Sequence, residues 1–551
     1  MKTLAPFALA CTLLVLGAAV AKAQPTQIWS ASMPYPRTVG AKAVVDSQGN
    51  VYVADAGDDG TTSPTVTKFS STGQVLWVGH GPHEPRGDTV GIKLMPDGGV
   101  LAGFHHEVHD GRTDSTIQKF SANGALQWYR YTQQSYLYNF DVDSSGNFYG
   151  DYGTFVIKRK PNAETIWTVY PQGAHDAFEF ITLDQNGGVY ISIAETDTVD
   201  PTLWMTAHVN ASGSIISQVP SHATGTPMIL RNGFLYGIGS NVVLDSNQHI
   251  QFVAAAYKLD SDMNTMWTTS TDVLTGGHVF QTAVDSQGNF FTSSYGNTGG
   301  PTPVVTTKYD TNGNVVFQKS FAGAAIGSAV NYPIDMKTDA AGNVFVLMYL
   351  YMRLGLANEG NWTDYGIIQY DPAGNTVWPD SGGSFFNGAI IYDSGMNEED
   401  DGGMGFDAMG NILIGGTAHN FSGPQIYQVE AAKFGTPDSS SFNFQFVPTT
   451  MQAGHTYQVT VGFKNTGSST WTFADGYSLE SRNPSRNTIW GITDVPISPS
   501  YPIAPGGSKG FVFTVTAPST PGHYNFQWQV TKAGEGGFGA LSPNLSINVT
   551  S

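Results

Sequence analysis

The sequence predicts an all-β protein with two parts: an eight-bladed β-propeller, with seven blades as the alternative, and a C-terminal β-sandwich. Three observations lead to this fold class. A turn motif of the form D-x-x-G-[NG] recurs along most of the chain, and a second motif with an aromatic residue follows it at a fixed distance. Both repeats stop near residue 434, where the strand pattern changes. The repeat length of about 50 residues is the size of one four-stranded propeller blade.

The composition favours short strands joined by tight turns and argues against nucleic-acid binding. Of the 551 residues, 65 are glycine and 29 are proline, and only 13% are charged. The formal net charge of -19 would repel a phosphate backbone, because nucleic-acid binding depends on neutralising phosphates with lysine and arginine. We therefore expect no nucleic-acid partner.

Residues 1–23 have the features of a cleavable secretory signal peptide. Lys2 precedes an apolar run over residues 4–20, and a small-x-small cleavage site ends at Ala23. We expect removal after Ala23 and secretion to an extracellular or periplasmic location. Cys11, the single cysteine, lies in this segment, so the exported protein would have no disulfide bonds. No other apolar run is long enough to span a membrane.

The first motif predicts a hairpin turn in each repeat. Aspartate hydrogen-bonds to nearby backbone in turns, and glycine adopts the positive φ that a tight turn needs. Alternating apolar residues follow, as in VDSQGNVYVAD around Asp46. We interpret LDSNQHIQFV, which contains Asp245, as a degraded copy; if it is an insertion, the propeller has seven blades. The other copies contain Asp46, Asp97, Asp143, Asp184, Asp285, Asp339 and Asp407.

The second motif, K-[FY]-x-x-x-G-x-x-x-W, predicts a second hairpin whose outer strand carries an aromatic residue. The aromatic residue follows the first position by nine residues in every copy, and His208 with Ser217 keeps this frame without the aromatic ring. Two hairpins make a four-stranded antiparallel blade. The pairs are Lys68 with Trp77, Lys119 with Trp128, Lys158 with Trp167, Lys258 with Trp267, Lys308 with Phe317 and Gln369 with Trp378.

The N-terminal segment is expected to close the propeller. The last repeat ends at Phe434 without the aromatic continuation, whereas Trp29 stands in the frame of the missing outer strand. Pairing the first strand with the last blade leaves no sheet edge exposed between the termini. We therefore assign residues 24–434 to the propeller.

These repeats resemble those of known propellers. The D-x-x-G-N-V-Y-V turns are similar to the repeats of secreted bacterial β-propeller proteins. The segment from Lys68 to Trp77 and its equivalents are similar to the tryptophan-docking repeat of quinoprotein-type propellers. The resemblance implies a fold and not an activity, because propellers serve in both binding and catalysis.

The C-terminal part resembles a known immunoglobulin-like domain. Residues 435–441 form a short linker, and strand patterns such as HTYQVTVGF alternate with turns over residues 442–551, the size of an immunoglobulin-like β-sandwich. The pattern is similar to the four-tryptophan (FW) domain of autophagy receptors, which also occurs in secreted bacterial proteins. Trp471 and Trp528 match two of the family's tryptophans. The resemblance implies an accessory interaction module, and burial in the sandwich core is the alternative role for both rings.

The connections between hairpins are the expected place for a binding site. Both hairpin turns of a blade lie on one face, so the longer connections gather on the other face. Aromatic residues there suit stacking on sugars or docking of a peptide. We expect recognition of an extracellular polysaccharide or protein, with a polysaccharide hydrolase or lyase as the alternative. The candidate ligand-binding residues are Tyr131, Tyr136, Tyr332, Tyr349, Tyr351 and Trp362.

Five histidines in two neighbouring connections are candidates for a metal site. Imidazole and carboxylate side chains together can bind zinc or a similar divalent ion. The acidic segment DAGDDG at residues 55–60 is a weaker candidate for calcium. Histidines that simply face solvent are the alternative interpretation. The candidate metal ligands are His80, His83, His105, His106 and His109.

Overall fold

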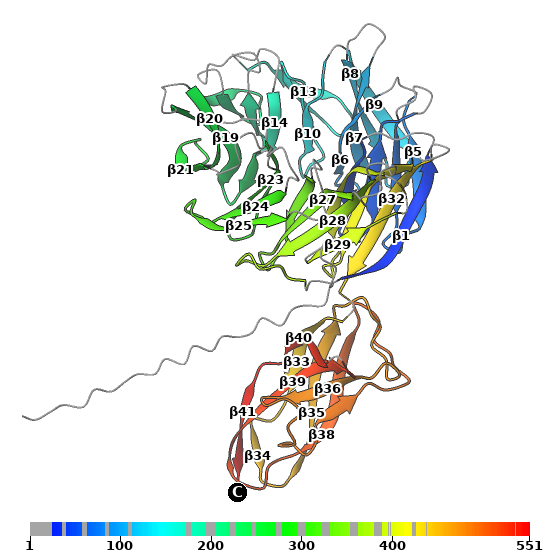
Figure 1. Ribbon diagram of the computed structural model, residues 1–551, viewed down its shortest axis with the longest axis vertical. Helices are drawn as coiled ribbons and strands as arrows, with labels where there is room; N and C mark the ends of the chain where they lie inside the picture. The colour runs from blue at the N-terminus through cyan, green and yellow to red at the C-terminus, as the bar shows by residue number, and fades with distance from the viewer. Residues whose placement is uncertain are drawn as a thin grey trace, which may run out of the picture.

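The computed structural model describes most of the chain, and the regular elements of the described residues are β-strands (Figure 1). The predicted signal peptide lies outside the described residues. In the part described, no helix is long and apolar enough to cross a membrane. The described residues are 25–35, 40–57, 63–82, 87–107, 113–133, 135–171, 178–193, 205–220, 228–244, 250–270, 278–295, 303–321, 331–352, 362–378, 388–394, 396, 398–420, 426–436, 438–534 and 536–551.

Within these ranges, six successive segments each form a four-stranded antiparallel sheet. The first sheet contains β2 (Lys42–Val45), β3 (Val51–Asp55), β4 (Thr65–Phe69) and β5 (Val75–His80), and the second contains β6 (Thr89–Leu94), β7 (Val100–Glu107), β8 (Thr113–Phe120) and β9 (Leu126–Thr132). The third contains β10 (Asn139–Val142), β11 (Phe148–Asp151), β12 (Val156–Arg159) and β13 (Thr165–Val169), and the fourth contains β14 (Phe178–Leu183), β15 (Val189–Ile193), β16 (Met205–Val209) and β17 (Ile215–Pro220). The fifth contains β18 (Ile229–Arg231), β19 (Phe234–Leu244), β20 (Ile250–Leu259) and β21 (Thr265–Ser270), and the sixth contains β22 (His278–Val284), β23 (Phe290–Tyr295), β24 (Val304–Tyr309) and β25 (Val315–Phe321).

The remaining propeller strands form one eight-stranded sheet with two antiparallel halves. A single parallel bridge, between Thr363 and Glu398, joins the halves. One half contains β26 (Tyr332–Thr338), β27 (Val344–Met352), β28 (Trp362–Tyr370) and β29 (Ala389–Tyr392). The other contains β30 (Glu398–Phe406), β31 (Ile412–Asn420), β32 (Ile426–Gly435) and β1 (Thr26–Tyr35).

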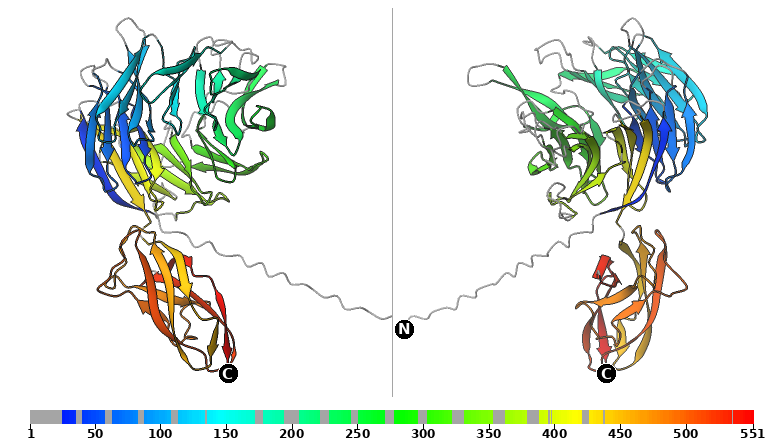
Figure 2. Two further views of the ribbon diagram at one scale, coloured as in Figure 1. Left: turned by 180° about the vertical axis from the view of Figure 1, so that it is seen from behind. Right: turned by 45° about the vertical axis from the view of Figure 1, so that its right-hand side comes forward.

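The first strand of each unit faces the centre of a ring. These strands pack against one another in the order β2, β6, β10, β14, β18, β22, β26 and β30, and β30 packs against β2 again. Figures 1 and 2 show the sheets arranged around this centre. This arrangement is a β-propeller, as the repeats predict.

The D-x-x-G-[NG] motif forms the first hairpin turn of six described units. The copy assigned to Asp97 is wrong, because Met95 takes the aspartate position in the turn of the second sheet and Asp97 Oδ1 accepts from the backbone N–H of Gly99 at 3.0 Å. Asp46 Oδ1 accepts hydrogen bonds from the backbone N–H groups of Gln48 and Asn50, both at 2.9 Å, and Gly49 has a φ of 80°. The carboxylate therefore replaces the backbone partners that the tight turn cannot provide. The same pair of backbone bonds is present at Asp143, Asp184, Asp285, Asp339 and Asp407.

The interpretation of Asp245 as a degraded copy of this turn is wrong. In the fifth sheet, β18 and β19 are joined by Asn232 and Gly233, whose φ values are 53° and 80°. Both positive values are those of a two-residue hairpin turn, for which Asn-Gly is the preferred pair. Asp245 comes after Leu244, the last residue of β19, and lies outside the described residues.

The aromatic residue of the second motif docks on the next sheet. Trp77 Nε1 donates a hydrogen bond to the carbonyl of Ala122 at 3.0 Å, in the turn between β8 and β9. In the same turn Gly124 has a φ of 85°, and a Cβ on it would lie 2.7 Å from the Trp77 ring. The ring therefore lies directly on the turn backbone, where Gly124 leaves room for it. In the equivalent turn that Trp128 contacts, Ala163 takes this position with a φ of 67°. Equivalent hydrogen bonds run from Trp29 to Ser71, Trp128 to Pro161, Trp167 to Ala211 and Trp267 to Thr311.

The fourth sheet lacks the aromatic ring, and the turn that faces it lacks the glycine. The outer strand of the fourth sheet carries Ser217 in the aromatic position, and Met263 takes the glycine position of the facing turn with a φ of 65°. Met263 is buried in an apolar cluster with Tyr190 and Leu259. An apolar side chain thus fills the space that an indole ring occupies elsewhere.

The N-terminal strand closes the ring. β1 pairs antiparallel with β32, from Thr26 opposite Gly435 to Tyr35 opposite Tyr427. Trp29 on β1 then docks on the turn of the first sheet, where a Cβ on Gly73 would lie 2.8 Å from its ring. The last sheet and the first sheet are therefore joined by the same contact as the others.

Residues after Gly435 form two further sheets that share one core. Val461 and Phe511 from one sheet pack with Leu479, Phe526 and Ile547 from the other. The first sheet contains β33 (Ser440–Phe446), β35 (Thr456–Asn465) and β38 (Ser508–Thr516). The second contains β34 (Thr450–Gln452), β41 (Leu545–Thr550), β39 (Gly522–Lys532), β36 (Tyr477–Arg482) and β37 (Asp494–Pro496), with β40 (Gly536–Leu541) paired to β39.

The tryptophans of this C-terminal part are core residues. Trp471, Trp490 and Trp528 are fully buried in the shared core. Trp490 Nε1 donates to the carbonyl of Asn525 at 2.9 Å, and Trp528 lies edge-on to Phe513. Burial therefore accounts for these rings, as the alternative interpretation of the sequence has it.

Glu430 on β32 is an acidic side chain buried in the propeller. Gln428 Nε2 donates to Glu430 Oε2 at 3.2 Å. Burial raises the pKa of Glu430 to about 8, because the charged form loses its hydration, and hydrogen bonds from Gln428, Ser394 and Tyr392 oppose this only in part. The carboxyl group is therefore protonated at neutral pH.

We expect Gly124→Ala to destabilise the propeller more than Gly410→Ala. Both glycines have φ near 80°, but a Cβ on Gly410 meets nothing within 4 Å, whereas one on Gly124 meets the Trp77 ring. Gly410→Ala, the control, should therefore lose only the stability that positive φ costs an alanine, about 1–2 kcal/mol. Gly124→Ala should also lose the docking contact, on the order of another 1–3 kcal/mol of the free energy of unfolding. Chemical unfolding curves measure both values; equal losses would show that docking does not stabilise the ring.

We expect Glu430→Gln to flatten the pH dependence of stability. The unfolded chain ionises this carboxyl near its ordinary pKa, so its stability contribution is full below that pKa and is lost as the pH rises to about 8. Between about pH 5 and pH 8 the wild type should lose on the order of 2–4 kcal/mol more than the variant. Parallel pH profiles of the free energy of unfolding would contradict the buried, neutral carboxyl.

Candidate functional site

The connections between hairpins of the second and third sheets bring several aromatic side chains together. His105 lies near the end of β7, and the other residues follow β9, β11 and β13, at the face opposite the D-x-x-G-[NG] turns. The hairpin turns fix the strands, and the connections carry side chains that the fold itself does not need. We call His105, Tyr136, Tyr138, Tyr152, Phe155 and Tyr170 the aromatic cluster.

His105 holds one end of the aromatic cluster. Its Nε2 atom lies 2.5 Å from the carbonyl oxygen of Leu137, and since a carbonyl only accepts, Nε2 carries the proton. The ring centre of Tyr136 lies 3.6 Å from that of His105, and the Tyr138 ring follows at 4.7 Å from Tyr136. Burial lowers the pKa of His105, although the Leu137 carbonyl and the Asp88 carboxylate act in the opposite direction. Burial thus disfavours the charged form of the imidazole that supports the tyrosine rings.

The third sheet supplies the other end of the aromatic cluster. Tyr152 and Phe155 stack with ring centres 5.0 Å apart, and Tyr170 lies 5.8 Å from Phe155. A Cβ on Gly153 would lie 2.9 Å from the Tyr138 ring, so the two ends adjoin. Tyr136 and Tyr170 are exposed, while Tyr152 is buried beneath. The cluster therefore presents rings to solvent from a packed base.

Tyr131 lies on the neighbouring outer strand and has a fixed hydroxyl group. The hydroxyl donates to the Asp114 carboxylate, which is buried. Ser115 accepts from the backbone N–H of Leu137 at 2.9 Å and donates to the carbonyl of Ser135 at 2.7 Å. These bonds fix the connection that carries Tyr136, so the exposed rings are held without a bound partner.

The predicted aromatic residues do not all meet in one place. Tyr131 and Tyr136 lie at the second and third sheets. Tyr332 and Tyr349 face each other on β26 and β27; Tyr332 packs edge-on to Tyr295, and Tyr349 OH donates to Asp401 at 3.1 Å. Both rings are half-buried. The side chains of Tyr351 and Trp362 lie outside the described residues.

The predicted metal ligands are only partly described. His106 Nε2 lies 2.8 Å from Thr116 Oγ1, while the neighbouring His105 bonds to Leu137, so these two imidazoles have separate partners. His80 is exposed at the end of β5, and His83 and His109 lie outside the described residues. In the segments that the structure describes, no three His, Cys, Asp or Glu side chains form a group that could hold a metal. Zinc or calcium binding therefore stays a prediction.

The sequence reasoning missed Tyr138, Tyr152, Phe155 and Tyr170. Each stands in or beside a connection between hairpins, which is the rule that selected Tyr131 and Tyr136. The short segment between β11 and β12 contains an aromatic residue at each end, and that was the available signal.

Comparison with solved structures finds similar chains at low identity, among them a propeller and a WD40 domain. No protein-family model and no curated protein matches the chain. The Dos1 propeller has 9% identity and a TM-score of 0.44, with 74% of this chain and 94% of that one covered. A eukaryotic initiation factor has 12% identity and a TM-score of 0.41, with 73% of this chain and 91% of that one covered. The Neurospora crassa Pan2 WD40 domain has 9% identity and a TM-score of 0.37, with 64% of this chain and 90% of that one covered. Similarity at this level does not extend to function.

We expect His105→Gln to reduce the loss of stability at acid pH. The unfolded chain takes up a proton at this histidine near the ordinary pKa of about 6.5, whereas burial disfavours that proton in the folded chain. Stability should therefore fall as the pH drops below about 6.5, and glutamine, which keeps an N–H donor for Leu137, should remove this component. Unfolding curves at pH 7 and pH 5 test it, with the exposed His80→Gln as control. Identical pH responses of wild type and His105→Gln would contradict it.

Proposed function

We propose that this chain is a secreted recognition protein that binds an extracellular polysaccharide or protein. Binding uses the face of the propeller that carries the connections between hairpins, opposite the D-x-x-G-[NG] turns. The exposed, pre-positioned aromatic cluster is the observation that carries this proposal. Tyrosine rings offer apolar faces for stacking and hydroxyl groups for hydrogen bonds at a low entropic cost. The chain's excess of acidic residues is consistent with a partner other than nucleic acid.

The proposal includes a propeller of eight blades and an immunoglobulin-like C-terminal domain of the FW type. The ring of innermost strands, with β1 completing the unit of β30 to β32, supports eight blades. The two sheets with one core support an immunoglobulin-like sandwich. The C-terminal domain would serve as an accessory interaction module.

Secretion rests on the N-terminal sequence. A charged start, an apolar run and a small-x-small site fit removal after Ala23. The chain after that site contains no cysteine, so it would fold in an oxidising compartment without disulfide exchange.

Binding by the aromatic cluster is tested with the chain lacking residues 1–23 and a panel of soluble glucans, mannans, xylans and pectins. Tyr136→Ala combined with Tyr170→Ala should weaken binding of the recognised polysaccharide at least tenfold, because each lost stacking ring contributes about 1 kcal/mol or more. Tyr501→Ala is the matched control, since Tyr501 is 68% exposed and Tyr170 69%.

Other results would change the proposal. Equal affinity of the double variant and the control would remove the aromatic cluster as the binding site. Formation of new chain ends in the bound polysaccharide would favour the hydrolase or lyase alternative. Absence of polysaccharide binding, with binding of a defined extracellular protein that the double variant loses, would assign the site to a protein partner.

A further inference from the structure

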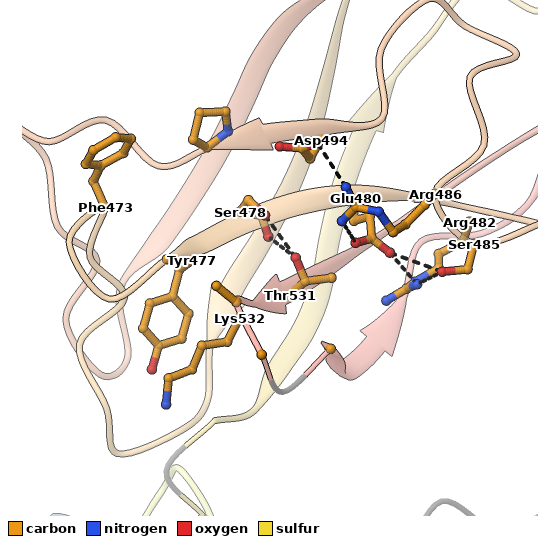
Figure 3. A pocket seen from close by; sticks show the side chains of 15 residues that line it. Phe473, Tyr477, Ser478, Glu480, Arg482, Ser485, Arg486, Asp494, Thr531 and Lys532 are labelled. Atoms are coloured by element: carbon orange, nitrogen blue, oxygen red, sulfur yellow. Dashed lines mark hydrogen bonds and ion pairs between the residues drawn. The ribbon is translucent and has the colours of Figure 1, made fainter.

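The C-terminal domain carries a hollow of about 610 Å³ on the outer face of its second sheet (Figure 3). Leu479 and Val530 point into the core, so their neighbours Ser478, Glu480 and Thr531 point outward and form the floor. Asp494 on β37 and the turn after Arg482 form one wall, and Gly534 and Gly536 form another. This volume suits a ligand of small-molecule size.

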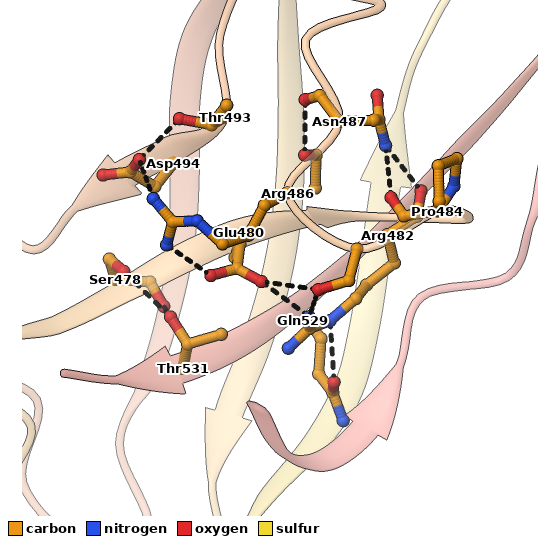
Figure 4. Close-up of polar contacts among 12 residues, drawn as sticks. Ser478, Glu480, Arg482, Pro484, Arg486, Asn487, Thr493, Asp494, Gln529 and Thr531 are labelled. Atoms are coloured by element: carbon orange, nitrogen blue, oxygen red, sulfur yellow. Dashed lines mark hydrogen bonds and ion pairs between the residues drawn. The ribbon is translucent and has the colours of Figure 1, made fainter. Parts of the chain in front are cut away.

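One end of the hollow is an ordered charged network (Figure 4). Arg482 Nη1 lies 2.6 Å from Glu480 Oε1, and Arg486 Nη1 lies 2.9 Å from Glu480 Oε2. Gln529 Oε1 accepts from Arg482 Nε at 3.0 Å, and Ser485 donates to Glu480 at 3.1 Å. The Glu480 carboxylate is nearly buried under both arginines. Their guanidinium groups are therefore positioned in advance.

At this end of the hollow, the Arg486 and Asp494 side chains remain open to solvent. The Arg486 side chain is 64% exposed, and its Nη2 lies 3.8 Å from Asp494 Oδ1. Asp494 also accepts from the Thr493 hydroxyl at 2.7 Å, and its side chain is partly exposed. An exposed donor and an exposed acceptor thus lie side by side.

The other end has an aromatic ring. Figure 3 shows Phe473 at the end opposite Arg486, with the Ser478 and Thr531 hydroxyls between them. Phe473 is 50% exposed, and the two hydroxyl oxygens lie 2.9 Å apart. Lys532 and Tyr477 are paired two residues away from Val530 and Leu479, so they point to the other face of the sheet, where Lys532 Nζ pairs with Asp438 at 3.1 Å and lies over the Tyr477 ring. The hollow therefore has one apolar surface and several fixed polar groups.

The charges of the hollow are nearly balanced. Arg482 and Arg486 stand against Glu480 and Asp494, while the Lys532 ammonium pairs with Asp438 on the other face of the sheet. An anionic ligand would meet the carboxylates and a cationic ligand the arginines, so neither has a net electrostatic advantage. A hydroxyl group both donates and accepts, and so fits an adjacent carboxylate and guanidinium at once.

We propose that this hollow binds a neutral saccharide. The Asp494 carboxylate and the Arg486 guanidinium take neighbouring sugar hydroxyls, Ser478 and Thr531 bond further hydroxyls, and Phe473 stacks on the apolar face of a ring. The site is separate from the aromatic cluster of the propeller and uses different chemistry. It would make the C-terminal domain a second sugar-binding module.

The test uses the full chain after Ala23 with Tyr136→Ala and Tyr170→Ala already present, so that the propeller cluster does not contribute. Calorimetric titration with hexasaccharides of glucose, mannose, galactose and xylose should give saturable binding of at least one. Phe473→Ala and, separately, Asp494→Ala should each weaken it at least tenfold. Phe446→Ala, at a 70% exposed position outside the hollow, is the matched control and should leave it unchanged.

The remaining outcomes overturn the proposal. They are binding of none of the neutral hexasaccharides, binding that survives both substitutions in the hollow, and binding only of an oligogalacturonate or of an acidic or basic peptide. Because the propeller cluster is already removed, each outcome concerns the hollow alone, and the function proposed for the propeller is judged by its own variants.

Discussion

The docking of an indole ring on a glycine turn is the contact on which the propeller depends. Trp77 joins the first sheet to the second through one hydrogen bond and a ring face on Gly124, and Trp29 makes the same contact between the last sheet and the first. Each contact holds the outermost strand of one sheet, where pairing is otherwise one-sided. Opposite Ser217 the ring and the glycine are both absent, and the buried Met263 side chain takes the glycine position.

Turn chemistry made the repeats visible in the sequence. A carboxylate such as Asp46 and a glycine at a fixed distance are needed by the turn itself, so no tertiary information was required to find them. The fifth sheet was misassigned because its two-residue turn, Asn232-Gly233, leaves a short signal, while Asp245 resembles the longer turn by chance. Contacts between sheets, such as that of His105 with Tyr136, depend on how neighbouring sheets meet, which local patterns do not encode.

The two proposed sites differ in how they are built. The aromatic cluster presents rings supported by a buried imidazole, whereas the hollow of the C-terminal domain presents charged and hydroxyl groups fixed by Glu480. The hollow could not be predicted from sequence, because alternating polar residues such as Glu480 and Arg482 are typical of any solvent-facing strand. Binding of one polymer by both proposed sites would raise its apparent affinity, provided that the short connection from Gly435 to Ser440 lets both engage.

The pairing of β1 with β32 also sets the order in which the protein can be completed. Thr26 meets Gly435 about 400 residues later, so loop-closure entropy opposes this contact until the intervening sheets are in place. During synthesis the first strand must wait, unpaired, until nearly the whole propeller has been made. The ring therefore closes last, when β1 pairs with β32. The C-terminal domain begins directly after β32.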